Sequence, residues 1–150
     1  MKLINGKSIG ERAEWLAIGA GLKGLSRLLM YLAGKDPWIG RAVKEFDGVY
    51  RFENAVGNHS RYMVFSNGKV KAPGKWKDEA DFTFTLYESI SYYRRAKAED
   101  LLEMAIANKI GQTGNSHYLF QFGFVMSLVE RYFKRKMNRT KMTRKGAARI

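Results

Sequence analysis

Apolar residues recur every three or four positions in the first third of the chain. This spacing places them on one face of an α-helix. The stripe predicts a helix that packs on the core of its own domain, or alternatively a helix that lies on a membrane surface or forms a dimer. Its members are Trp15, Ile18, Leu22, Leu25, Leu29 and Leu32.

Polar and turn-forming residues predict where this helix begins and ends. Ser8 and Glu11 have the spacing of a capping box, so we expect the helix to begin near Ser8. Gly34 and the following Pro37 are typical of a helix end. Residues 38–46 then predict a second, short helix.

The same segment is too short in its apolar part to predict a membrane span. Its unbroken apolar part, residues 15–22, ends at Lys23 and is shorter than the roughly 20 residues that cross a bilayer. Glu11 and Glu14 stand where a signal peptide would carry positive charge. We therefore expect neither a signal peptide nor a transmembrane helix.

From residue 48 the apolar pattern changes to a period of two. Residues 49–53, 61–65 and 69–71 alternate as β-strands do. The pair Asn67-Gly68 between the last two segments favours a tight hairpin turn. The segments predict an antiparallel meander with one buried face.

Residues 81–86 predict a further strand, which we expect to be central in the sheet. Phe82, Phe84 and Leu86 alternate with polar residues, so they share one face. That face should be buried and the opposite one more polar.

The remainder of the chain predicts helices. Residues 89–95 and 99–108 form two short helical segments, and residues 116–133 form a longer one. Alternation and helical spacing compete in the last segment, but the helical pattern continues further. Asn115 or Ser116 can cap its N-terminus.

Positive charge dominates the composition and gathers near the C-terminus. The 150 residues carry 27 Lys and Arg against 14 Asp and Glu, a formal net charge of +13. Such a field attracts nucleic acid or an anionic membrane. The alternatives for the tail are a solvated, partly disordered segment, a lipid-binding polybasic segment, or a nucleic-acid arm. The candidate polyanion contacts are Lys134, Arg135, Lys136, Arg139, Lys141, Arg144 and Lys145.

No pattern indicates an enzyme or a cofactor. The chain has no cysteine, which excludes thiol chemistry and zinc–thiolate sites, and its two histidines lie far apart. Residues 111–114 match neither a nucleotide-binding loop nor a dinucleotide fingerprint. Glu99, Asp100 and Glu103 begin a predicted helix, where acids complement the dipole. We expect no catalytic residues, no metal and no cofactor.

Two motifs carry a resemblance to a known family. The first is Ala-Asp-Phe-Thr-Phe-Thr-Leu over residues 80–86, and the second is Met-Ala-Ile-Ala-Asn-Lys-Ile-Gly-Gln-Thr-Gly-Asn over residues 104–115. With the order of elements, they resemble the sterol-carrier-protein type-two-like (SCP-2-like) lipid-binding domains over residues 45–133. Asn108 stands where the family usually has Gly.

The resemblance implies an α+β fold, with a five-stranded mostly antiparallel sheet covered on one face by helices. It also implies an apolar cavity between sheet and helices that binds a fatty acyl chain, a sterol or a similar lipid without chemistry. Alternatively, the same side chains pack on each other and leave a solid core. The candidate ligand-binding residues are Phe84, Leu86, Ile90, Leu102, Ile106, Leu119, Phe122, Met126 and Val129.

These observations give the expected organisation: a helical extension over residues 1–44, a lipid-binding domain over residues 45–133 and a basic tail over residues 134–150. The main hypothesis is a cytoplasmic lipid-binding or lipid-transfer protein, peripheral at anionic membranes. The alternatives are a nucleic-acid-associated protein that acts through its tail, and an accessory domain that binds protein, or a second copy of itself, through the stripe of Trp15 to Leu32.

Overall fold

The computed structural model describes residues 2–87, 103, 104, 107 and 109–148. The predicted helices over residues 89–95 and 99–108 fall largely outside this part. The elements are α1 (Lys2–Ala33), α2 (Pro37–Glu45), β1 (Gly48–Asn54), β2 (Ser60–Ser66), β3 (Lys69–Lys71), β4 (Phe82–Leu86), β5 (Gly111–Gly114) and α5 (Ser116–Ala148).

The five strands form one sheet in the order β3-β2-β1-β4-β5. Strand β4 runs parallel to β1, and the other neighbours pair antiparallel. This confirms the α+β fold with a mostly antiparallel five-stranded sheet. The predicted strand over residues 81–86 is interior, but the prediction that it is central was wrong. The chain leaves the β1–β2–β3 meander and returns on the other side of β1, which is therefore the middle strand.

Asp81 fixes this return of the chain. Its side-chain Oδ2 accepts a hydrogen bond of 2.8 Å from the Val49 N–H. Its own N–H donates to the Val49 carbonyl, also at 2.8 Å. The first residue of β4 is thereby aligned with β1, and Phe82 pairs with Tyr50.

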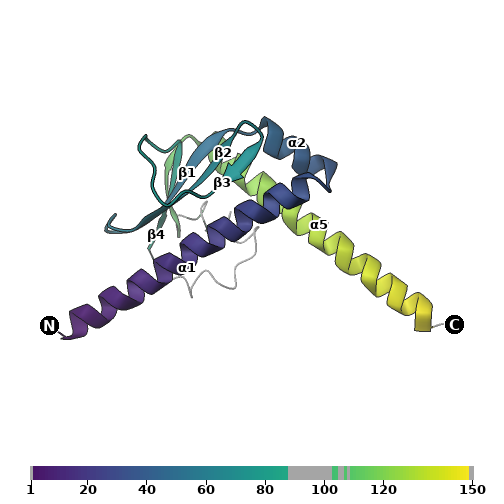
Figure 1. Ribbon diagram of the computed structural model, residues 1–150, viewed down its shortest axis with the longest axis horizontal. Helices are drawn as coiled ribbons and strands as arrows, with labels where there is room; N and C mark the ends of the chain where they lie inside the picture. The colour runs from purple at the N-terminus through teal and green to yellow at the C-terminus, as the bar shows by residue number, and fades with distance from the viewer. Residues whose placement is uncertain (1, 88–102, 105–106, 108, 149–150) are drawn as a thin grey trace.

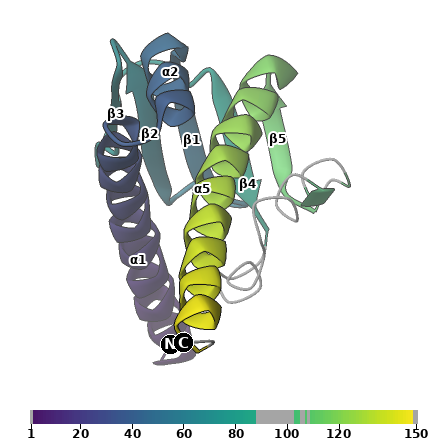
Figure 2. The same cartoon turned by 90° about the vertical axis from the view of Figure 1, so that its right-hand side faces the viewer.

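The helices cover one face of the sheet, as Figures 1 and 2 show from two sides. Paired residues of neighbouring strands point to the same face, so the register assigns the apolar side chains that meet the helices. All are buried apart from Phe52, which is half-buried. They are Tyr50 and Phe52 of β1, Met63 and Phe65 of β2, Val70 of β3, and Phe82 and Phe84 of β4.

Helix α1 packs through the predicted stripe. Trp15, Leu22, Leu29 and Leu32 are buried, and the last three belong to the core cluster. This favours the alternative in which the helix packs on its own domain. The predicted start at Ser8 was wrong, because the helix already begins at Lys2. A capping box is a short local signal, and helical residues precede it here.

By length and composition alone, the stretch Gly10–Ala33 of α1 could cross a membrane. The sequence prediction counted only residues 15–22, so its argument from length was wrong for this helix. Core helices of soluble proteins pass the same test, as do signal sequences near an N-terminus. Only 17% of the apolar 18-residue window in this stretch is buried, through the stripe of α1 that packs on the core.

Side-chain caps begin the other two helices. The Asp36 carboxylate accepts hydrogen bonds from the N–H groups of Trp38 and Ile39, at 2.8 and 3.2 Å. Of the two predicted caps of α5, Asn115 is the one observed: its side chain accepts from the His117 N–H at 2.9 Å.

Helix α5 continues unbroken to Ala148, well beyond the predicted end at Phe133. The tail is therefore helical, rather than disordered, up to Ala148. The side chains described from Phe133 to Lys141 are all exposed. Figure 1 shows this yellow half of α5 leaving the sheet layer.

Candidate functional site

Phe122 of α5 lies at the centre of an aromatic cluster on the covered face of the sheet. Its ring centroid is 5.1 Å from that of Tyr50, 5.9 Å from that of Phe52 and 5.4 Å from that of Phe84. Phe84 also stacks on Phe52 at 5.1 Å. We call these four residues the aromatic layer; it joins α5 to β1 and β4.

The predicted ligand-binding residues that are described belong to the same core cluster as Phe84, or pack against it. Leu119 and Val129 are buried, whereas Leu86 and Met126 are half-buried and pack against the same core. The structure thus brings together Phe84, Leu86, Leu119, Phe122, Met126 and Val129. The other three predicted residues, Ile90, Leu102 and Ile106, lie outside the described part of the chain, as does Asn108.

Sequence reasoning missed three side chains of this region. Tyr50 and Phe52 could have been found, because they alternate within a predicted strand and so share a face. Gln121 gave no signal, since a polar residue within an apolar helix usually faces solvent. Its exposed fraction is only 8%.

Gln121 and Tyr50 form a polar link inside the apolar region. The Gln121 Nε2 donates to the Tyr50 hydroxyl at 3.0 Å and to the Asp47 carbonyl at 3.1 Å. The Tyr50 hydroxyl donates to the Tyr118 carbonyl at 2.8 Å. Burial is the main cause that raises the pKa of Tyr50, so this phenol stays neutral. The link ties α5 to β1 and supplies no acid or base for chemistry.

The glycine at the end of the second motif has a structural role. A Cβ built on Gly114 would lie 2.5 Å from the Asp81 carbonyl oxygen and 3.1 Å from the Phe82 Cα. Gly114 also has φ of 127°, a conformation that other residues rarely adopt. Gly114 thus lets β5 lie close to β4, whereas Asp81 aligns β4 with β1, and β1 and β4 carry the aromatic layer.

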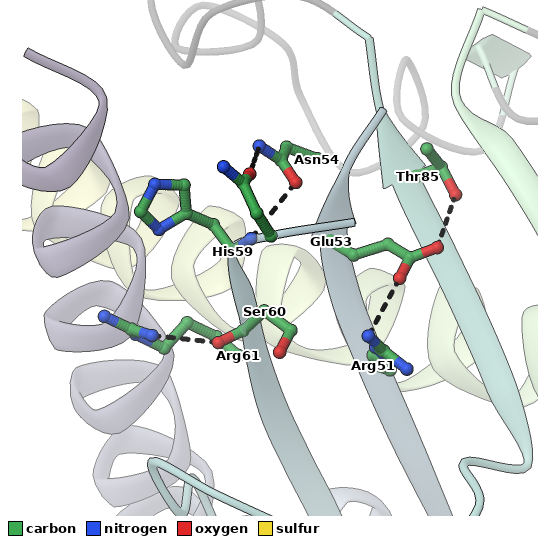
Figure 3. A network of polar contacts seen from close by, with 8 residues as sticks. Arg51, Glu53, Asn54, His59, Ser60, Arg61 and Thr85 are labelled. Atoms are coloured by element: carbon green, nitrogen blue, oxygen red, sulfur yellow. Dashed lines mark hydrogen bonds and ion pairs between the residues drawn. The ribbon is translucent and has the colours of Figure 1, made fainter. Parts of the chain in front are cut away.

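The polar face of the sheet carries a separate network (Figure 3). Glu53 pairs with Arg51 at 3.1 Å and accepts from the Thr85 hydroxyl at 3.4 Å. Among the residues that the structure describes, no group of three His, Asp or Glu side chains could hold a metal ion.

Fold and site together define an α+β domain whose apolar layer is held between a mixed sheet and a long C-terminal helix. The model of the SCP-2 sterol transfer family matches residues 26–126, most of the chain. The protein belongs to this family, and the predicted resemblance is confirmed. Domains of the family bind hydrophobic lipid ligands and are generally non-catalytic carriers.

The chain is also similar to solved structures, one of which shares the fold at a TM-score above 0.5. One neighbour, described as "UbiJ-SCP2 Ubiquinone synthesis protein", has a TM-score of 0.56 and 23% identity, over 76% of this chain and 92% of its own. The sterol carrier protein domain 2 of Helicoverpa armigera has a TM-score of 0.49 and 17% identity, over 70% of this chain and 84% of its own. A comparison with curated proteins found no match.

Proposed function

We propose that the protein binds, and passes between membranes, one hydrophobic ligand held between β4 and α5. The ligand is a fatty acyl chain, a sterol or a lipid of similar shape, and it leaves unchanged. The observation that carries this proposal is the apolar wall formed by the aromatic layer and its neighbours on α5. Membership in the family supports it.

The side chains of this wall suit a ligand of variable shape. Phe122 and Met126 are both half-buried, although they lie on the side of α5 that faces the sheet. A methionine side chain is flexible and polarisable, so it can follow different ligand surfaces. The residues Ile90, Leu102 and Ile106 remain predicted parts of the same wall.

We further propose that the exposed half of α5 contacts an anionic membrane. Arg135, Lys136 and Lys141 are exposed on a helix that extends away from the core. Lys134 is exposed too, although it pairs with Glu130 at 3.1 Å. Each cation near an anionic surface contributes about 1 kcal/mol, so several together hold a protein there. This would place the lipid site next to its source.

Native mass spectrometry of the purified protein tests the ligand proposal. We expect mass additions in the range of a single lipid, lost on denaturation and identified in an organic extract. After delipidation, added palmitate should restore one addition per chain. A protein that carries no lipid and takes up neither palmitate nor cholesterol would contradict the proposal.

A further inference from the structure

A pocket lies on the helix-covered face of the sheet, between α1 and the β2–β3 side. Its volume is about 380 Å³, within the size range of small-molecule sites. None of the residues that line it belongs to the aromatic layer. Its apolar wall includes Leu16, Ala20 and Leu22 of α1, with Ala72 and Pro73 after β3.

Three basic side chains line this pocket, and no acidic one does. They are Lys23 of α1, Arg61 of β2 and Lys75 of the segment after β3. None of the three takes part in the ion pairs found in the described part of the chain. Like charges gathered in one pocket repel one another, and a bound anion would remove that cost.

Arg61 is held in the pocket by its surroundings. Figure 3 shows its side chain extending from β2 towards α1, with Nη1 donating to the Ser60 carbonyl at 2.9 Å. A Cβ built on Gly19 would lie only 2.7 Å from the Arg61 Nε. The missing side chain at position 19 therefore makes the room in which this guanidinium lies against the helix.

We propose that this pocket binds the phosphate group of an amphiphile through Arg61, Lys23 and Lys75. The first carbons of the attached chain lie against Leu16 and Ala72. Guanidinium and ammonium groups form strong charge-assisted hydrogen bonds with such oxygens. The pocket is distinct from the lipid site proposed above, and the two can fail independently.

Titrations of the full-length protein with three probes test the chemistry: inorganic phosphate, octyl phosphate and octyl glucoside. We expect octyl phosphate to bind more tightly than phosphate and to shift the backbone amide NMR signals of Gly19, Ala72 and Gly74. Octyl glucoside should leave those signals unchanged. Equal shifts with octyl glucoside, or shifts only outside the pocket, would overturn the proposal.

Two variants test the assigned groups. Arg61→Gln should weaken octyl phosphate binding by about tenfold or more, because a charged hydrogen bond is lost. Gly19→Ala should weaken it as well, since the new methyl group displaces the guanidinium. Gly21→Ala is the matched control: it adds the same methyl to the same helix, where nothing lies within 4 Å. Unchanged affinity in both Arg61→Gln and Gly19→Ala would refute the assignment.

Charge controls and vesicles complete the design. If Arg61→Gln unfolds, the exposed pair Lys23→Gln with Lys75→Gln replaces it, and Lys44→Gln tests whether any lost charge has the same effect. An equal loss with Lys44→Gln would overturn the site.

Pocket signals that move with phosphatidic acid vesicles but not phosphatidylcholine vesicles indicate a lipid head group as the natural source. Signals that move only with octyl phosphate or phosphate indicate a free anion. Met126→Trp, which alters the lipid site, should leave the pocket titration unchanged.

Discussion

The ring of Phe122 lies 5.4 Å from the ring of Phe84, so helix α5 meets strand β4 through two side chains that are far apart in the sequence. Phe84 is buried, whereas Phe122 is half-buried. Phe84 thus belongs to the core, and Phe122 lies between the core and the proposed ligand. This pair sets the geometry on which the proposed function depends.

Phe84→Ala should lower the free energy of unfolding by about 3–5 kcal/mol, because it removes a buried ring from among four others. Chemical denaturation measures the loss. Phe124→Ala removes the same atoms from a side chain that is 49% exposed, and should cost much less. Equal stability of Phe84→Ala and the wild type would remove β4 from the core.

Tyr50→Phe should destabilise the protein by about 1 kcal/mol at neutral pH, since the hydroxyl links Gln121 to the Tyr118 carbonyl. It should also change the dependence on pH. Burial raises the pKa of Tyr50 above the ordinary value of 10.0, so an unfolded chain releases this proton more readily than the folded one. The contribution is complete below the unfolded pKa and is lost as pH rises towards the folded pKa.

Urea denaturation at about pH 8 and about pH 11 measures this difference. The decline in stability between the two should be smaller in Tyr50→Phe than in the wild type. Tyr87→Phe is the control, because this side chain is 56% exposed. An identical decline in wild type and Tyr50→Phe would mean that the buried phenol does not control alkaline stability.

The local patterns of the sequence were enough to predict most elements. Alternation predicted the strands of Tyr50 and Phe84, and helical spacing predicted α1 and α5. An element with one buried face has apolar residues at the period of that element, so the sequence alone shows it. The position of β4 beside β1 could not be predicted, since it depends on the hydrogen bonds of Asp81 to Val49 across the sheet. The burial of Gln121 could not be predicted either, because its hydrogen-bond partners Tyr50 and Asp47 lie far away in the sequence. The basic pocket was also hidden, because Lys23, Arg61 and Lys75 come from three separate segments.

The exposed half of α5 gives a prediction about membranes. Full-length protein should bind phosphatidylglycerol vesicles, and the affinity should fall as salt shortens the screening length from about 10 Å at 0.1 M to about 3 Å at 1 M. Truncation after Phe133 should abolish this binding and leave lipid uptake intact. A vesicle flotation assay measures it.

A charge-matched comparison separates the tail from the overall charge. Neutralising three tail residues should weaken vesicle binding more than neutralising three exposed lysines near β3. A chain that ignores these vesicles but binds RNA or DNA with a steep salt dependence, lost on truncation, would make α5 a nucleic-acid arm. The tail substitutions are Arg135→Gln, Lys136→Gln and Lys141→Gln; the control substitutions are Lys69→Gln, Lys71→Gln and Lys77→Gln.

The most direct test of the central claim is displacement of a fluorescent fatty acid from wild type and Met126→Trp. Met126 packs against the core beside the aromatic layer, so a larger side chain there should fill the proposed site and weaken fatty-acid binding by about tenfold. Met137→Trp places the same side chain on the exposed part of α5, where Met137 is 60% exposed, and should bind as the wild type does. If all three proteins bind the fatty acid equally while remaining folded, no lipid is held between β4 and α5.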